Sequence, residues 1–255
     1  MTAPVLAPTR FQAPLINPAP DGLYAATRWT EIGPGEPSRH LNGVEVKGSN
    51  YGGDNAFGVW EGHYCSAPQP GQKKEGERPE ILDPFDPVTV WAYDECDLTA
   101  PSQREVELRA AQIMRLEEQV AVEREVGNRL LLDAGTPETA ATLKLAVGYL
   151  EGRMAQTNTV GYFHAGAQWA SQEFGLVIKS GTRWTSPLGH VWIFGGGYVE
   201  GLANTIVATS QPFGWRDQVA LRTAIDERTN TFAAIAERTV LVGYEALVAA
   251  VTVTP

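Results

Sequence analysis

The chain has 255 residues, of which 43% are hydrophobic and 20% are charged, with 30 acidic and 20 basic side chains. This composition is typical of a globular protein and argues against a wholly disordered chain or a collagen-like repeat. The formal net charge of -10 also argues against a general nucleic-acid-binding protein, because binding to phosphate backbones depends mainly on Lys and Arg.

The sequence carries no sign of export or membrane insertion. No apolar run approaches the roughly 20 residues of a membrane-spanning helix. Residues 1–14 lack the basic region and the long apolar region of a secretory signal. Cys65 and Cys96 are too few for a disulfide framework, so we expect reduced and partly buried thiols. Together these features predict a protein of a cytoplasm-like compartment.

Proline recurs throughout residues 1–55, and no apolar face survives between the prolines. We therefore expect an extended N-terminal arm that has no hydrophobic core of its own and must be held by another surface. The prolines that define this arm are Pro4, Pro8, Pro14, Pro18, Pro20, Pro34 and Pro37.

Two segments, 57–65 and 88–97, are rich in aromatic and β-branched residues and have the pattern of strands. The stretch between them is rich in Pro, Gly and charge. The sequence thus predicts a long β-hairpin over about 56–98 with a tip that cannot pack internally. Because a two-stranded ribbon alone is marginal in water, we expect it to lie on its own subunit or on a neighbour.

The longest predicted helix begins near Ser102 and ends before Gly135. Ser102 and Glu105 have the spacing of a capping box, and Gly135 is a typical helix stop. About thirty residues at 1.5 Å each give a strut of roughly 45 Å. Arg and Glu cover the remaining circumference, as either a solvated face or a surface for ionic contact with neighbours. The expected apolar stripe contains Val106, Ala110, Ile113, Leu116 and Val120, and it is followed on a drifting face by Val122, Val126 and Leu130.

The rest of the chain mixes helices and strands, so the predicted fold class is α+β. We expect helices over 139–156 and 161–174. The final β-rich runs are 231–239 and 240–254, the second of which could contain a helical turn. Between the helices and these runs, we expect strands over 176–180, 183–186, 190–194, 205–209 and 215–225.

No enzymatic motif is present. Residues 195–201 are glycine-rich but match neither a dinucleotide nor a phosphate-binding pattern. The tryptophans, among them Trp169, Trp184, Trp192 and Trp215, fit a core or a subunit contact better than a ligand cleft. We predict no enzyme, no catalytic residue, no cofactor and no metal. The side chains considered were the isolated His40, His63, His164 and His190 and the acidic Asp83, Asp86, Asp94, Glu95 and Asp97, which lack metal-binding patterns.

Residues 205–253 resemble the end of a tailed-phage major capsid protein of the HK97 fold. In that family a hydrophobic strand and a turn precede a long strand with an AER-type signature, here Ala236-Glu237-Arg238. An apolar run and a closing strand follow, here 241–253. The chain departs from the pattern at Tyr244-Glu245-Ala246, where the family commonly has Pro.

The resemblance implies five parts along the chain: an N-terminal arm (1–55), an E-loop (56–98), a spine helix (99–136), an axial domain (137–225) and C-terminal strands that return to a peripheral domain (226–255). It further implies a structural coat subunit that self-assembles into hexamers and pentamers of an icosahedral head. The head would enclose double-stranded DNA without binding it specifically, which suits an acidic wall. Scaffold, portal or decoration proteins are possible partners, and assembly would take place in the host cytoplasm, away from membranes.

Some members of the family cross-link a hairpin Lys to an Asn of a neighbour, but no such partner can be assigned to Lys73 or Lys74. Two alternatives remain open. One is an encapsulin-like nanocompartment shell, and the other is a small-molecule enzyme or carbohydrate-binding module that uses the Trp-rich strands. The charged residues predicted to contact neighbouring subunits are Lys73, Lys74, Arg78, Arg104, Arg109, Glu117 and Arg124.

Overall fold

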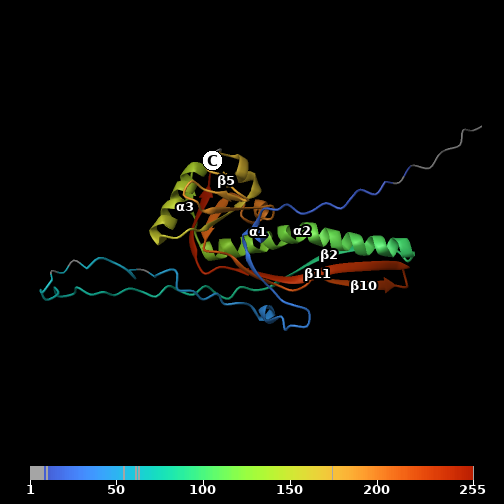
Figure 1. Cartoon of the computed structure of the whole chain (residues 1–255), viewed down its shortest axis with the longest axis horizontal. Helices are drawn as coiled ribbons and strands as arrows, with labels where there is room; N and C mark the ends of the chain where they lie inside the picture. Colours follow the sequence, from blue (N-terminus) through green and yellow to red (C-terminus); the bar gives the residue numbers. More distant parts are fainter. Residues whose placement is uncertain are drawn as a thin grey trace, which may run out of the picture.

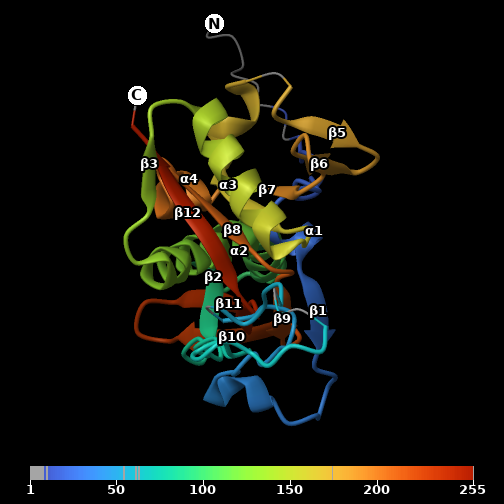
Figure 2. The ribbon, with the colours of Figure 1, turned by 90° about the vertical axis from the view of Figure 1, so that its left-hand side faces the viewer.

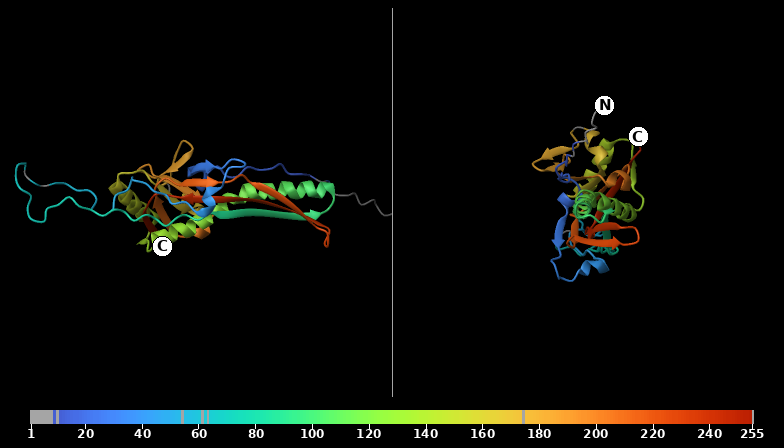
Figure 3. Two further views of the ribbon diagram at one scale, coloured as in Figure 1. Left: turned by 90° about the horizontal axis from the view of Figure 1, so that it is seen from below. Right: turned by 90° about the vertical axis from the view of Figure 1, so that its right-hand side faces the viewer.

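The computed structural model describes residues 9, 11–53, 55–60, 62, 64–173 and 175–254. It confirms the α+β class, with one five-stranded and one seven-stranded sheet. The subunit is elongated (Figure 1). The long helix α2 (Ala100–Ala134) runs beside the strands of the first sheet, and the second sheet with α3 (Leu143–Thr157) forms a more compact half. A long loop projects from one end, as the view from below also shows (Figure 3).

The five-stranded sheet is built around the long strand β11 (Thr231–Gly243). Antiparallel partners flank it, namely β10 (Ala220–Asp226), β2 (Val88–Asp97) and β9 (Phe213–Arg216). The N-terminal strand β1 (Arg28–Glu31) adds to β9 in parallel. This sheet therefore combines segments from both ends of the chain.

Helix α2 confirms the predicted strut: its 35 residues span about 52 Å at 1.5 Å per residue. It ends at Gly135, whose φ of 61° is suited to glycine. The predicted capping box is wrong, because the helix begins two residues earlier, with Thr99 at the N-cap. The Ser102 hydroxyl instead interacts with the Thr99 hydroxyl at 2.9 Å.

The buried side of α2 turns around the helix along its length. Four residues rotate the helix by 400°, so a series with that spacing drifts by about 40° per step. The first half packs on β2 and β11, and the second half packs against both the end of β11 and residues of the seven-stranded sheet. In the predicted stripe, Ile113 is half-buried and packs on the same cluster as Ala110, whereas Leu116 and Val120 are only half-buried and are not members of the buried series. The predicted drift to Val122, Val126 and Leu130 is confirmed. The buried series is Val106, Ala110, Met114, Glu118, Val122, Val126 and Leu130.

The seven-stranded sheet forms the compact half, and α3 lies across one of its faces (Figure 2). Leu150 and Met154 of α3 are fully buried there. The short helices α1 (Leu23–Ala26) and α4 (Tyr198–Gly201) and the 3-10 turns η1 (Arg39–Asn42) and η2 (Ala167–Ser171) complete the described chain. The strand order is β3 (Glu138–Ala140), β12 (Leu247–Val253), β8 (Thr205–Thr209), β4 (Tyr162–Gly166), β7 (Val191–Gly195), β6 (Arg183–Thr185) and β5 (Ile178–Ser180).

Several predicted elements change type or length. The helix expected over 161–174 is wrong: its start is β4, a central strand with five buried residues, followed by η2. A short apolar run buried on both faces gives no periodicity that separates strand from helix. The helix expected from 139 begins at 143, because 138–140 pair with β12 as β3. The strand over 205–209 is confirmed, whereas 215–225 belongs to two strands and 240–254 contains no helical turn.

The predicted hairpin is also wrong in its pairing. The described residues within 57–65 form no strand, and β2 pairs with β11 instead. The alternation in β2 reflects a sheet that packs on α2 with one face only, so Ala92 is buried and Trp91 is exposed. The described residues within 45–84 form the projecting loop, which is closed at its root by two 2.9 Å hydrogen bonds between Val44 and Phe85.

The N-terminal arm is anchored in the subunit's own core, contrary to the prediction for residues 1–55. Residues 11–20 are exposed, but Leu23 of α1 is fully buried and joins the main core cluster. The reason is that the short segment from Leu23 to Glu31 supplies both an apolar anchor and the edge strand β1.

Candidate assembly interface

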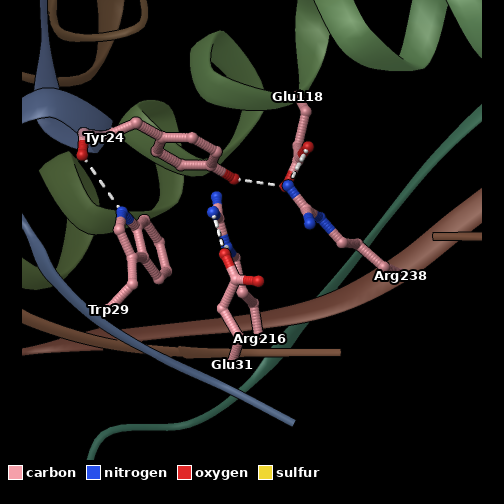
Figure 4. Close-up of polar contacts among 6 residues, drawn as sticks. All are labelled: Tyr24, Trp29, Glu31, Glu118, Arg216 and Arg238. Atoms are coloured by element: carbon pink, nitrogen blue, oxygen red, sulfur yellow. Dashed lines mark hydrogen bonds and ion pairs between the residues drawn. The ribbon is translucent and has the colours of Figure 1, made fainter. Parts of the chain in front are cut away.

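A buried ion pair connects the long helix to the long strand. Arg238 of β11 donates to the two carboxylate oxygens of Glu118 on α2, at 2.5 and 2.6 Å (Figure 4). Burial alone would lower the pKa of Arg238, but the hydrogen bonds and charge of Glu118 raise it above its ordinary value. The Arg of the Ala236-Glu237-Arg238 signature therefore connects β11 to α2 within the subunit.

The N-terminal arm joins the same pair. The Tyr24 hydroxyl donates to Glu118 at 2.5 Å, and burial together with the Glu118 charge raises the pKa of Tyr24, so that it remains a donor. The Trp29 ring nitrogen donates to the Tyr24 carbonyl at 3.0 Å. Arg216 lies 4.4 Å from the Trp29 ring and bonds Glu31, which lowers the pKa of that carboxyl (Figure 4).

Polar side chains of α2 hold the preceding part of the arm by its backbone. Gln112 and Arg115 donate to the Ile16 carbonyl at 2.7 and 3.0 Å. Gln119 donates to the Asp21 carbonyl at 2.9 Å. The segment from Ile16 to Tyr24 therefore lies on the helix of its own subunit.

Glu123 links three parts of the subunit. Its carboxylate accepts hydrogen bonds from the backbone of Leu23 in α1 and of Gly197 before α4, each at 3.0 Å, and from Gln119. Burial raises the pKa of Glu123, while these donors oppose the increase. A Cβ at Gly197 would lie 2.1 Å from the Val120 carbonyl oxygen. The glycine-rich segment therefore serves close packing of α4 on α2.

Glu118 and Glu123 are not among the residues predicted to form contacts, because acidic residues on a helix usually face solvent. One signal was available: Glu118 continues the four-residue spacing that starts at Val106 and Ala110. Its burial depends on Arg238, which is 120 residues away in the chain.

Two apolar surfaces of the described chain remain uncovered. The outer face of the β2–β11–β10 sheet, opposite α2, exposes Trp91 by 65% and Tyr93 by 42%, and Tyr93 pairs in register with the exposed Ile235. The projecting loop exposes Phe57 by 88% and Tyr64 by 98%. Clustered exposure of this kind marks interaction surfaces.

The seven charged contact candidates are all exposed and fall into two groups. Lys73, Lys74 and Arg78 lie on the loop, and Arg104, Arg109, Glu117 and Arg124 lie on α2. Some are already engaged within the subunit. Lys73 pairs with Glu75 at 3.3 Å and Lys74 lies 5.1 Å from the Trp60 ring, whereas Arg109 pairs with Asp94 at 3.1 Å and Arg124 with Glu200 at 3.0 Å.

The histidine and tryptophan side chains considered as possible functional groups lie mostly in packed surroundings. His164 is buried between Tyr198 and Thr209, and burial lowers its pKa to about 3, so the ring is neutral near pH 7. Trp169 and Trp192 belong to the core. Among the described residues, no three His, Cys, Asp or Glu side chains are grouped so as to hold a metal, and no helix is long and apolar enough to cross a membrane. His63 lies outside the described residues. The expected partial burial of the cysteines is wrong, because Cys65 and Cys96 are both exposed.

No protein-family model and no curated protein matches this sequence. Solved structures do. A Microbacterium phage Oxtober96 chain aligns over 100% of this chain and 96% of its own length, with 12% identity and a TM-score of 0.53. The chain has the HK97-like coat fold. A native GTA particle capsid gives a TM-score of 0.56 at 12% identity, over 98% of this chain and 94% of that one.

Two further solved structures align over the whole chain or most of it. The mature capsid of bacteriophage PhiM1 aligns over 100% of this chain and 92% of its own, with 12% identity and a TM-score of 0.52. A virus-like particle from Pyrococcus furiosus aligns over 91% of both chains, with 10% identity and a TM-score of 0.52.

Proposed function

We propose that this chain is the major capsid subunit of a tailed phage, which self-assembles into an icosahedral shell enclosing double-stranded DNA. The observation that carries the proposal is the whole-length fold match to phage capsid subunits, which includes the projecting loop and the arm. The role is structural and not enzymatic. Its location is the virion capsid, after assembly in the host cytoplasm.

The uncovered surfaces favour burial by neighbouring copies. The projecting loop lies across the outer face of the β2–β11–β10 sheet of an adjacent subunit in this proposal. Its exposed Phe57 and Tyr64 meet the apolar Trp91 and Tyr93, and burial of apolar area contributes about 25 cal/mol per Å². Charge complementarity would favour one orientation of the loop, since the returning side of the loop carries Lys73 and Lys74. The outer face and its ends carry the acidic Glu95, Asp97, Asp226 and Glu237.

The subunit would form hexamers and pentamers, with an N-terminal arm, the projecting loop within 45–84, a spine helix, an axial domain and a peripheral domain. The charged candidates on α2 would contact adjacent subunits. Scaffold, portal and decoration proteins are further partners. The net charge of -10 suits a wall that encloses DNA without gripping it.

Electron microscopy of the purified full chain tests this function. Shells are expected, and a variant that lacks residues 54–76 should keep its circular dichroism spectrum but form none, because β2 and the loop root are spared. A chain that stays monomeric at every concentration, or shells formed without the loop, would contradict the proposal. Empty shells that copurify with peptide cargo would favour the encapsulin-like alternative, whereas DNA-filled particles support the phage capsid.

A further inference from the structure

The projecting loop is held on its outgoing side by one carboxylate. After Val44, the chain passes the link between β11 and β12, where Glu245 accepts from the Asn50 backbone at 2.8 Å and from the Asn50 side-chain amide at 2.5 Å. A Cβ on Gly48 would lie 1.9 Å from the Glu245 carboxyl carbon. Glycine at position 48 is thus what lets the loop pass so close to this carboxylate.

The link that carries Glu245 is fixed to the body of the subunit. The backbone nitrogens of Glu245 and Ala246 donate to the Ser210 hydroxyl at 2.9 and 3.1 Å. The Ser210 backbone in turn donates to the Ala246 carbonyl at 2.9 Å. Ser210 is buried. The hydrogen bonds between Glu245 and Asn50 therefore fix the loop relative to the seven-stranded half.

The returning side of the loop is held by Arg129 of α2, which is connected through Asp133 to Tyr244, the neighbour of Glu245 in the link between β11 and β12. Arg129 of α2 donates to the carbonyls of Asp83 and Pro84 at 2.6 and 2.9 Å. Its other nitrogen bonds Asp133 at 2.8 Å, and Asp133 also accepts from the Tyr244 hydroxyl at 2.5 Å. Adjacent residues of one link therefore hold the loop on both sides.

We propose that these four residues, Arg129, Asp133, Tyr244 and Glu245, form a root clamp that sets the direction in which the loop leaves the subunit. Glu245 is the positioning residue of the outgoing side. The consequence for assembly rests on the proposed function, since direction matters only if the loop reaches a neighbour.

Because the loop is long, a small change at its root moves its tip by a large distance. The described residues of 45–84 contain no helix and no strand. An isolated β-bridge between Val44 and Phe85 lies just outside them, at the root of the loop. About twenty extended residues reach up to roughly 65 Å, so a rotation of about 10° at the root displaces the tip by up to roughly 11 Å. A displacement of that size moves the tip to different residues on a neighbouring sheet.

The first test follows the loop in the dispersed subunit by amide hydrogen exchange. Glu245→Ala should accelerate exchange at the Asn50 amide about tenfold or more, and Gly48→Ala should do the same by displacing the carboxylate. Glu245→Gln retains an oxygen acceptor and should restore protection. Glu80→Ala, an exposed acidic residue of the loop's returning side, is the matched control and should leave Asn50 unchanged. Unchanged exchange in Glu245→Ala would overturn the clamp.

The second test examines shells of the same variants by electron microscopy. Glu245→Ala should give fewer closed shells and a broader range of diameters, at a melting temperature equal to that of the wild type, whereas Glu245→Gln and Glu80→Ala should give wild-type shells. Identical shells from Glu245→Ala would show that the clamp does not direct the loop. Absence of shells from the wild type would count against the proposed function, and the exchange measurement would still decide whether the clamp exists.

Discussion

Arg238 and Glu118 meet inside the subunit through two parallel hydrogen bonds, although 120 residues separate them in the chain. Their side chains are only 14% and 6% exposed, and Tyr24 of the arm donates to the same carboxylate. One buried pair thus holds β11, α2 and the arm in a fixed arrangement.

Arg238→Ala should destabilise the subunit by about 3–5 kcal/mol, because it leaves the Glu118 carboxylate buried without its partner. Chemical denaturation of the dispersed subunit measures this loss. Arg222→Ala is the control: Arg222 pairs with Glu237 on the exposed face, and such pairs contribute about 0–1 kcal/mol. Equal losses in the two variants would contradict a special role for the buried pair.

Gly197→Ala should destabilise the subunit by about 1–3 kcal/mol, because its Cβ would meet the backbone of α2. Gly148→Ala, on α3, has open space around the added Cβ and should instead stabilise by about 0.5–1 kcal/mol through helix propensity. Thermal unfolding of both variants compares them directly. A tolerated Gly197→Ala would mean that α4 does not pack tightly on α2.

The buried His164 should make stability fall as the solution is acidified. Its folded pKa of about 3 lies below the ordinary 6.5, so between these values the unfolded chain binds the proton that the folded chain rejects. The slope from this residue is at most about 1.4 kcal/mol per pH unit. His164→Phe should show a shallower loss of stability between pH 6.5 and 4 than the wild type. Parallel curves would contradict the expected titration.

Glu123 should act in the opposite direction. Burial raises its pKa above 4.5, so the folded chain holds a proton that the unfolded chain releases, and stability from this residue falls as the pH rises above 4.5. Glu123→Gln removes that dependence, and its stability relative to the wild type should increase with pH across this window. A Glu123→Gln curve parallel to the wild type would refute the raised pKa.

Trp91→Asp should block shell formation without unfolding the subunit, because Trp91 is exposed on the outer face of the sheet. Trp91→Phe keeps an apolar ring and should assemble. Electron microscopy counts shells, and circular dichroism checks the fold. Normal shells from Trp91→Asp would contradict the proposal that the loop of a neighbouring subunit covers this face of the sheet.

The sequence predicted those elements whose signals are local. The long helix and its stop at Gly135 follow from helix-forming residues and a glycine that accepts a positive φ. The strand over 205–209 follows from its β-branched run. By contrast, β4 was predicted as a helix, because a short strand that is buried on both faces has no distinctive periodicity. The strand β2 was paired with 57–65, because a short stretch of sequence does not specify the partner of a strand.

The assembly features divide in the same way. The sequence indicated a projecting segment, an arm and an exposed charged helix face, and the exposed contact candidates agree with that pattern. It did not indicate the buried Glu118 and Glu123, the arm anchored by Leu23, or the grip of Glu245 on Asn50. Each of these depends on a partner about 100 residues or more away.

The sequence by itself determined the α+β class, the strut helix, the absence of a recognisable catalytic motif and the resemblance of residues 205–253 to a phage coat protein. These depend on composition, local periodicity and a short signature. Only the tertiary structure decided which charges are internal, which face of the β2 sheet is open and how the loop is held at its root. A buried charge is stable only when a partner from elsewhere in the chain reaches it, and folding alone brings Arg238 to Glu118.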